Sequence, residues 1–271
     1  MLILLPPSEG KTAPRRGRPL RLDALSSPSL TDARKQVLSG LVELCGADHD
    51  PEVPVQNRIL LERAAGVLGV GPTQLDLVAA NARLHDAPAT RADRLYTGVL
   101  YDALDFATLS TAAKRRASTR VGIVSSLFGL LRPSDVVPAY RLAGDVTLPG
   151  LGPVAGVWRE HLGPAVEDAL GSGLLVDLRS STYASFWRPR AALADRVATV
   201  RVLHEQGGRR TVVSHFNKAT KGRIVRAVLE HGGNPRTPDQ LAGLLRELGW
   251  TVEVGEPGRK GTQLDVVVTA L

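Results

Sequence analysis

The chain has 271 residues, of which 43% are apolar and 23% are charged. This composition is that of a globular protein long enough to bury a sizeable core. No apolar run approaches the ~18 residues of a membrane span, and the short apolar run at residues 2–5 has no basic residue before it, so we expect neither a span nor a signal peptide. Cys45 is the single cysteine, which excludes an intrachain disulfide and a multi-cysteine metal site and favours a cytoplasmic location.

Positive charge is in excess: 34 Lys and Arg face 27 Asp and Glu, for a net charge of +7 and a pI near 10.0. Such a balance suits a polyanion, a phosphate ligand or an acidic substrate. Most of the basic residues are arginine, and Ala, Gly and Leu are also abundant, as GC-rich coding would produce. Both origins of the charge stay open at this stage.

The first half of the chain is mainly helical after one short strand. Residues 2–5 predict a buried strand, stopped by Pro6 and Pro7, and residues 10–21 a basic loop. Apolar residues at helical spacing predict helices over residues 31–44, 58–68, 73–84 and 103–116, with a polar loop at 48–54.

The second half alternates strands and helices. Strands are predicted at 121–125 and 174–178, antiparallel hairpins at 197–203 with 210–215 and at 250–254 with 264–269, helices at 154–170, 218–231 and 237–248, and a loop at 127–141. No domain boundary is visible. We therefore expect one α/β domain over residues 1–271, with a mixed sheet, flanking helices and a candidate helix-hairpin-helix element.

The loop after the first strand ends in Gly-Lys-Thr, like a phosphate-binding loop. That motif would need a glycine where Leu5 stands, and Pro6 and Pro7 remove two backbone donors. We therefore interpret Lys11 as an anion contact at a strand end and not as part of a nucleotide-binding P-loop.

Two glycines, Gly69 and Gly71, separate two predicted helices. In a helix-hairpin-helix unit such glycines expose backbone N–H groups to a DNA phosphate. An ordinary turn with a glycine stop and Pro72 at the next helix start has the same pattern, and few basic residues lie nearby. Both interpretations stay open.

Residues 209–226 carry six cations and no acid. Lys218 and Lys221 share one helix face near its N-terminus, where cations oppose the helix dipole and a bound anion would stabilise them. Arg223 and Arg226 lie on another face. The alternative is a solvated helix face.

A loop after the strand at 121–125 carries Arg132, Asp135, Tyr140 and Arg141. These residues either line a polar pocket or form a salt-bridged structural loop, and for Asp135 we favour the structural role. The histidines show no metal-ligand spacing, and no serine-hydrolase elbow is present. We expect no metal or redox cofactor.

Several sequence blocks, taken in order, match one known family. They are residues 2–12, Asn81-Ala82-Arg83, Tyr96-Thr97-Gly98, SLFGLLRPSD at 126–135, PAYRL at 138–142, Trp158, DLRSSTY at 177–183 and SHFNKATKGR at 214–223. In these blocks the chain resembles the peroxide-stress protein YaaA family. The resemblance implies a cytoplasmic bacterial protein that helps cells to survive hydrogen peroxide and that is linked with lower free iron. It also implies a single-domain α/β fold with a positively charged cleft, and binding of double-stranded DNA through a helix-hairpin-helix element.

Two functions follow as hypotheses. The first is non-specific binding of double-stranded DNA or another polyanion, with Lys218, Lys221 and Arg223 as charges, Gly69 and Gly71 as backbone donors, and Lys11 near the cleft. We expect neither a membrane partner nor an obligate protein partner. The alternative is an enzyme for a small phosphorylated or carboxylated substrate, using Lys11, Asn81, Arg83, Tyr96, Arg132, Tyr140, Arg141, Ser180, Tyr183 and Lys218.

The position of five cations should separate these hypotheses. Because carboxyl ends of parallel strands share one sheet edge, we expect one cleft wall to collect Lys11, Arg132, Arg141, Lys218 and Lys221. Asp135 and Glu9 would be their internal partners. One deep pocket favours the enzyme, whereas an open groove favours DNA binding.

Overall fold

The centre of the protein is an eight-stranded mixed sheet, with the order β11-β12-β9-β8-β1-β3-β4 and β10 paired with β9. The structure, a computed structural model, describes residues 1–46, 54–212 and 214–269. The sheet strands are β1 (Leu2–Leu5), β3 (Val121–Ser125), β4 (Gly129–Leu131), β8 (Leu175–Asp177), β9 (Val197–Gln206), β10 (Arg209–Thr211), β11 (Thr251–Val254) and β12 (Thr262–Val268). Two small ribbons pair β2 (Ala89–Arg91) with β5 (Val136–Pro138) and β6 (Thr147–Leu148) with β7 (Gly152–Pro153).

The middle of the sheet is parallel. β1 lies between β3 and β8, with Ile3 opposite Val121 on one side and Val176 on the other. All four residues of β1 are buried, as a strand covered on both faces requires. β8, β9 and β12 continue in the same direction, so the carboxyl ends of β1, β3, β8 and β9 point to one side. The outer strands β4 and β11 run antiparallel to their neighbours.

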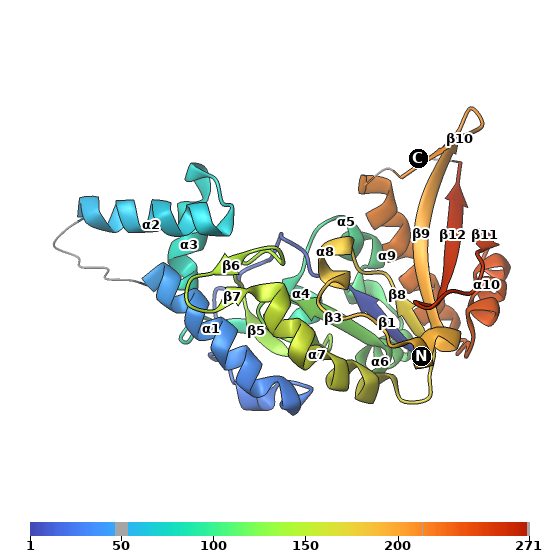
Figure 1. The fold of residues 1–271 in the computed structure, drawn as a ribbon, viewed down its shortest axis with the longest axis horizontal. Coiled ribbons are helices and arrows are strands. Elements are labelled where there is room, and N and C mark those ends of the chain that lie inside the picture. The colour runs from blue at the N-terminus through green and yellow to red at the C-terminus, as the bar shows by residue number, and fades with distance from the viewer. Residues whose placement is uncertain (47–53, 213, 270–271) are drawn as a thin grey trace.

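Helices pack around this sheet. The longer ones are α1 (Thr31–Gly46), α2 (Pro54–Leu68), α6 (Thr111–Arg120), α7 (Val154–Leu170), α9 (Ser214–His231) and α10 (Pro238–Glu247). Shorter ones are α3 (Leu75–Asn81), α4 (Ala92–Leu95), α5 (Val99–Leu104) and α8 (Ser181–Ala184). α9 and α10 contact β9, and α7 contacts β4 and α1. Figure 1 shows α2 and α3 at the end of the molecule away from β11 and α10.

Most predicted elements are present, including the mixed sheet, the flanking helices and both hairpins. The helix predicted at 103–116 is wrong: α5 ends before Asp105, which has a positive φ of 46°, and α6 begins after the Ser110 cap. The loop predicted at 127–141 holds β4 and β5. The loop predicted at 48–54 lies, except for residue 54, outside the described residues. Among the described residues, no helix is long and apolar enough to cross a membrane.

Candidate anion-binding site

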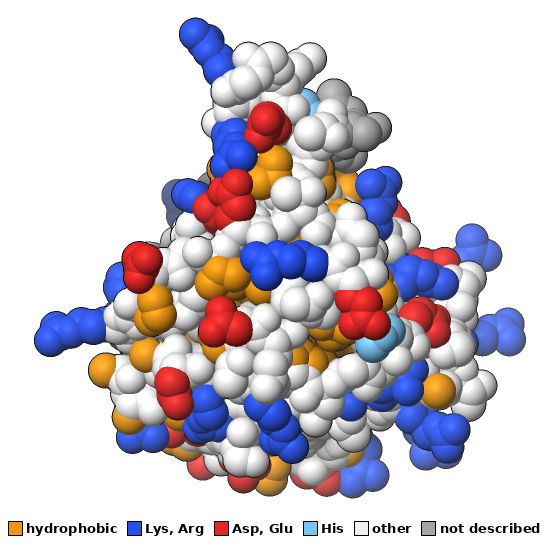
Figure 2. All heavy atoms as spheres, turned by 90° about the vertical axis from the view of Figure 1, so that its right-hand side faces the viewer, with side chains coloured by type: hydrophobic (Ala, Val, Ile, Leu, Met, Phe, Trp, Pro, Cys, Tyr) orange, Lys and Arg blue, Asp and Glu red, His pale blue; other side chains and the backbone are white. Residues whose placement is uncertain are grey.

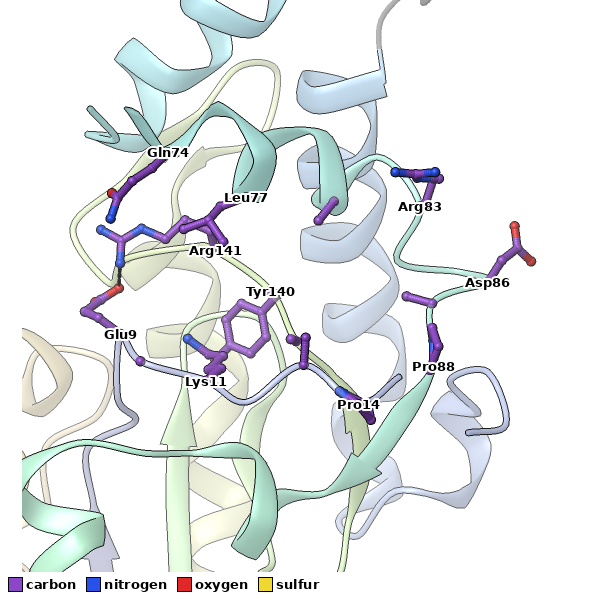
Figure 3. A pocket seen from close by; sticks show the side chains of 15 residues that line it. Glu9, Lys11, Pro14, Gln74, Leu77, Arg83, Asp86, Pro88, Tyr140 and Arg141 are labelled. Atoms are coloured by element: carbon purple, nitrogen blue, oxygen red, sulfur yellow. Dashed lines mark hydrogen bonds and ion pairs between the residues drawn. The ribbon is translucent and has the colours of Figure 1, made fainter. Parts of the chain in front are cut away.

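A cavity of about 680 Å³ opens beside the loop that follows β1. Its wall comes from this loop, from α3 with the turn after it, and from the segment after β5 (Figure 3). The lining residues are Glu9, Gly10, Lys11, Ala13, Pro14, Gln74, Leu77, Ala80, Arg83, Asp86, Ala87, Pro88, Ala139, Tyr140 and Arg141. Most of this wall is apolar, with a few charged groups, as in sites for small molecules.

Lys11 places its amine in the cavity wall. Nζ donates a hydrogen bond of 2.7 Å to the Ser8 carbonyl, and it lies 4.2 Å from the ring centroid of Tyr140. Burial lowers the pKa of Lys11 to about 8; Glu9 opposes this shift and Arg141 adds to it. No carboxylate accepts a hydrogen bond from this amine among the described residues. The cation is therefore held without the carboxylate partner that buried ammonium groups usually have.

The Tyr140 ring beneath this amine is fixed by a buried hydroxyl network. The Tyr140 hydroxyl is 2.7 Å from Ser125 Oγ and 3.0 Å from the Tyr96 hydroxyl. Ser125 Oγ also accepts from the backbone N–H groups of Leu127 and Phe128. Both of its lone pairs are thus used, so Ser125 donates its proton to Tyr140, whose hydroxyl also shares a hydrogen bond with Tyr96. Burial raises the pKa of both tyrosines, which keeps the network neutral.

Arg141 lies beside Lys11, and Asn81 holds its backbone. Asn81 Nδ2 donates to the Arg141 carbonyl at 2.8 Å, while Asn81 Oδ1 accepts from the Arg141 N–H at 2.9 Å. The guanidinium forms an ion pair with Glu9, and its buried Nε has no hydrogen-bond partner. Glu9 is thus the internal partner that we expected for this cluster. Asn81 itself is fully buried and positions Arg141 without lining the cavity.

Arg132 does not join this cavity. Its guanidinium donates to the carbonyls of Thr119 and Val121, at the start of β3. The prediction of one wall with five cations is wrong at this residue because β4 runs antiparallel to β3 and returns the chain to the opposite sheet edge. Asp135 accepts from the backbone N–H groups of Ser26 and Arg132. Its role is structural, as favoured from the sequence, and it does not face the Lys11 amine.

Some of the six cations of residues 209–226 are engaged by groups within the protein. Arg210 pairs with Glu205 and Glu253, each at 2.8 Å, and Arg226 donates to the carbonyl of Leu104. Figure 2 shows the face over α10, β11 and β12, where positive and negative side chains are interspersed. The segment therefore does not present its full charge to a partner.

Three predicted contact residues on α9, Lys218, Lys221 and Arg223, do not line the cavity. Lys221 Nζ donates to the Leu178 carbonyl at 3.2 Å, beyond the carboxyl end of β8. Burial lowers the pKa of Lys221, and Asp177 opposes this shift. Lys218 and Arg223 are exposed.

The turn between α2 and α3 does not establish a helix-hairpin-helix unit. Gly69 has a positive φ of 62° and ends α2, as glycine commonly does. Its N–H donates to the Gly66 carbonyl, and the Val70 N–H donates to the Ala65 carbonyl. Gly69 is therefore not free to donate to a phosphate. Gly71 precedes the short helix that begins at Pro72.

Other predicted residues lie at the margins or in the scaffold. Arg83 is exposed, and in Figure 3 it lies with Asp86 at the end of the cavity away from Lys11. Ser180 is exposed at the start of α8. Tyr183 is buried and packs on Phe186, with ring centroids 5.1 Å apart.

Sequence reasoning missed two buried arginines. Arg179 pairs with Asp177 at 2.7 Å and donates to the carbonyls of Tyr183 and Trp187, so it fixes the segment that carries Tyr183. Arg34 donates to the carbonyls of Phe128 and Leu130, and thereby holds the turn after β3. A basic residue among the apolar positions of α1 was the available signal for Arg34.

The fold and the cavity define a mixed α/β protein with a pocket at the carboxyl edge of its sheet. The chain belongs to the family described as peroxide stress protein YaaA, whose model matches residues 1–254, which confirms the resemblance seen in the sequence blocks. It is 48% identical over 270 residues to a UPF0246 protein of Streptomyces coelicolor, covering 99% of this chain and 98% of that protein.

More distant relatives share the same family name or have none. A UPF0246 protein of Corynebacterium efficiens is 39% identical over 269 residues, covering 98% of this chain and 100% of that protein. An uncharacterized protein of Campylobacter jejuni is 30% identical over 142 residues, covering 52% of this chain and 54% of that protein. Family membership supports a role in the peroxide-stress response.

Proposed function

We propose that the protein serves the peroxide-stress response by binding, and acting on, a small anionic molecule in the cavity beside Lys11. The observation that carries this proposal is the Lys11 amine, which lies in the cavity wall next to Arg141 with no carboxylate of its own. Two neighbouring cations repel each other, and burial adds a desolvation cost. An anionic ligand would remove both penalties.

The shape of the cavity favours a small molecule over a nucleic acid. About 680 Å³ is the size of an ordinary ligand pocket. Leu77, Ala80 and Pro88 give the wall an apolar surface, which a phosphate backbone would not use. A compact anion with an apolar body matches both parts of the wall. This proposal develops the enzyme hypothesis, of whose ten residues Lys11, Arg83, Tyr140 and Arg141 line the cavity.

Calorimetry with octanoate and octyl phosphate tests the proposal. Replacement of Lys11 by Met and of Arg141 by Gln should each weaken binding by about tenfold, since a hydrogen bond to a charged group contributes about 1.5–3 kcal/mol. Lys260→Met is the matched control because Lys260 is exposed and lies outside the residues that line the cavity. Binding that is equally weak in the control, or absent for both probes, would contradict the proposal.

Double-stranded DNA binding is the second candidate, and α9 supplies its support. Lys218 and Arg223 are exposed and have no hydrogen-bond or ion-pair partner among the described residues. Non-specific binding through them would be electrostatic. Titration of duplex DNA at several salt concentrations gives the slope of log affinity against log salt concentration. The magnitude of this slope should fall by about 0.9 for each phosphate contact that Lys218→Ala or Arg223→Ala removes. A slope that both variants leave unchanged would exclude α9 as the contact.

The proposal also covers the limitation of iron-driven damage, which the resemblance to the family implies. No three His, Cys, Asp or Glu side chains lie close enough to hold a metal ion within the part of the chain that the structure describes. We therefore place the effect on free iron downstream of the cavity ligand and not in a metal site on this chain. Stoichiometric iron in the purified protein, measured by elemental analysis, would overturn this placement.

A further inference from the structure

The two nitrogen groups of the cavity differ in chemistry, and the difference points to a particular kind of anion. Arg141 offers a planar guanidinium that stays charged and suits a carboxylate. Lys11 offers an amine that burial and a neighbouring cation both shift towards the neutral form. In Figure 3 both side chains lie at the same end of the cavity, with Glu9 and Gln74, while Arg83 and Asp86 lie at the other end.

Within the described part of the chain, the Lys11 amine has no carboxylate partner that would hold it in the charged form. An anchoring lysine would be kept charged by carboxylates, but Glu9, the acid that opposes the lowering of the Lys11 pKa, forms its ion pair with Arg141. At pH 7 a lysine with a pKa of about 8 is neutral roughly 300 times more often than one at its ordinary value of 10.5. A neutral amine has the lone pair that attacks a carbonyl carbon.

We infer that the cavity accepts a 2-oxo acid with an apolar tail, and that Lys11 forms an imine with its carbonyl group. This inference rests on the proposed function and names its substrate class. The carboxylate would lie on Arg141, the carbonyl carbon next to it would face Lys11, and the tail would contact Leu77, Ala80 and Pro88. A carboxylate and a carbonyl on adjacent carbons match two adjacent nitrogen groups.

The bond changes balance without any further reagent. Lys11 Nζ attacks the carbonyl carbon, the C=O double bond opens to a carbinolamine, and a C=N double bond replaces it. The carbonyl oxygen leaves as water together with both amine protons. Glu9, at the mouth of the cavity beside Arg141, can carry one of these protons from nitrogen to oxygen.

Arg141 has the support that such a role requires. Asn81 fixes its backbone through two hydrogen bonds of 2.8 and 2.9 Å, and these do not depend on the Arg141 side chain. Arg141→Gln therefore keeps this support while removing the guanidinium. The buried Nε has no hydrogen-bond partner, so the ion pair with Glu9 does not satisfy every donor of this guanidinium.

Reductive trapping tests the inference. The intact protein is incubated with pyruvate, 2-oxohexanoate or 2-oxooctanoate and cyanoborohydride, and the modified peptides are identified by mass spectrometry. We expect the adduct on Lys11, formed at least about tenfold faster than on exposed Lys260. The Lys11 yield should rise towards pH 8, increase with tail length, and fall about tenfold in Arg141→Gln while the Lys260 background stays constant.

Controls separate this inference from the proposed function. Octanoate and 2-hydroxyoctanoate have the carboxylate and the tail but no carbonyl. If they bind while every 2-oxo acid fails to trap on Lys11, the imine is wrong and the anion site remains. If adducts spread over the exposed lysines with Lys11 at or below their rate, the imine is also wrong. If neither octanoate nor 2-hydroxyoctanoate nor the 2-oxo acids bind, the proposed function fails and the imine with it.

Discussion

The Lys11 pocket and the segment at residues 209–226 both concentrate positive charge, but the cations of the two regions have different partners. In the segment, Arg210 pairs with two glutamates and Arg226 donates to backbone carbonyls. In the pocket, Lys11 has one carbonyl and an aromatic face, and its neighbour Arg141 forms an ion pair with Glu9. Arg210 and Arg226 are thus compensated within the protein, whereas the Lys11 amine has no acidic partner among the residues that the structure describes. Burial without a counter-ion marks a binding site better than the number of cations does.

The largest expected effect is on stability. Burial lowers the Lys11 pKa to about 8, so the folded state binds fewer protons than the unfolded state between about pH 8 and 10.5, and wild-type stability rises with pH in that window. Lys11→Met should raise the free energy of unfolding at pH 7 by about 3 kcal/mol, a gain that disappears near pH 10.5. Urea titrations at several pH values measure this.

The basic segment supplies the control for that prediction. Lys218 is exposed, so Lys218→Met should change the free energy of unfolding by less than about 0.5 kcal/mol at every pH. An equal gain in the free energy of unfolding in both variants, or a loss in Lys11→Met, would contradict the proposed difference between the pocket and the segment.

The next effect concerns the support of Arg141. Asn81→Ala leaves the backbone N–H and carbonyl of Arg141 without partners in a buried place, which should cost about 2–3 kcal/mol. Asn81→Asp keeps the acceptor but places a buried carboxylate against the Arg141 carbonyl, so it should destabilise the protein at least as much. Thermal unfolding of both variants shows which of them is the less stable. If Asn81→Ala weakens octanoate binding no more than Lys260→Met does, Asn81 does not position Arg141.

A smaller effect should appear in the pH dependence of anion binding. Lys11 loses its charge as the pH rises through about 8, so octanoate affinity should fall by about tenfold between pH 7 and 9.5. Arg141 stays charged over this range, so binding should weaken and not vanish. Calorimetry on wild type and Lys11→Met provides the measurement. A variant that shows the same decline would assign the titration to another group. Trapping of 2-oxo acids has the opposite dependence and rises towards pH 8.

The sequence predicted the regular parts of this molecule well. The helix over 154–170 and the strand over 121–125 have the predicted bounds, because long or buried apolar patterns are sufficient there. The prediction failed where backbone geometry decides. Asp105 in the left-handed region interrupts an otherwise helical pattern, and no apolar period shows this.

The candidate site was predictable only in part. Lys11 follows a buried parallel strand, so the strand-end rule placed it correctly at the sheet edge. The same rule failed for Arg132 because the short β4 turns back, and this reversal carries no sequence signal. Asn81 was recognised as important, but the partner that it holds is 60 positions away in the chain. Pairings of that kind come from the tertiary fold and not from local pattern.

Cys45 gives the smallest expected effect, and it extends the comparison from cations to a thiol. Burial raises its pKa to about 11, although the Asn81 amide, whose Nδ2 is 3.7 Å from Sγ, opposes this shift. Peroxide reacts with the thiolate, so this cysteine should be inert to peroxide despite the family to which the chain belongs. Intact-mass measurement after peroxide treatment should show no oxidation at Cys45. A sulfenic or sulfinic adduct there at low peroxide would contradict this expectation.

Burial thus has opposite effects on the reactivity of Lys11 and of Cys45. Burial favours the neutral form of each group. For an amine the neutral form is the nucleophile, whereas for a thiol it is the unreactive form. Cys45→Ala should therefore leave peroxide survival unchanged in a complemented deletion strain, while Lys11→Met abolishes the complementation. If Cys45→Ala also removes protection at equal protein abundance, the Cys45 thiol takes part in the function together with the Lys11 pocket.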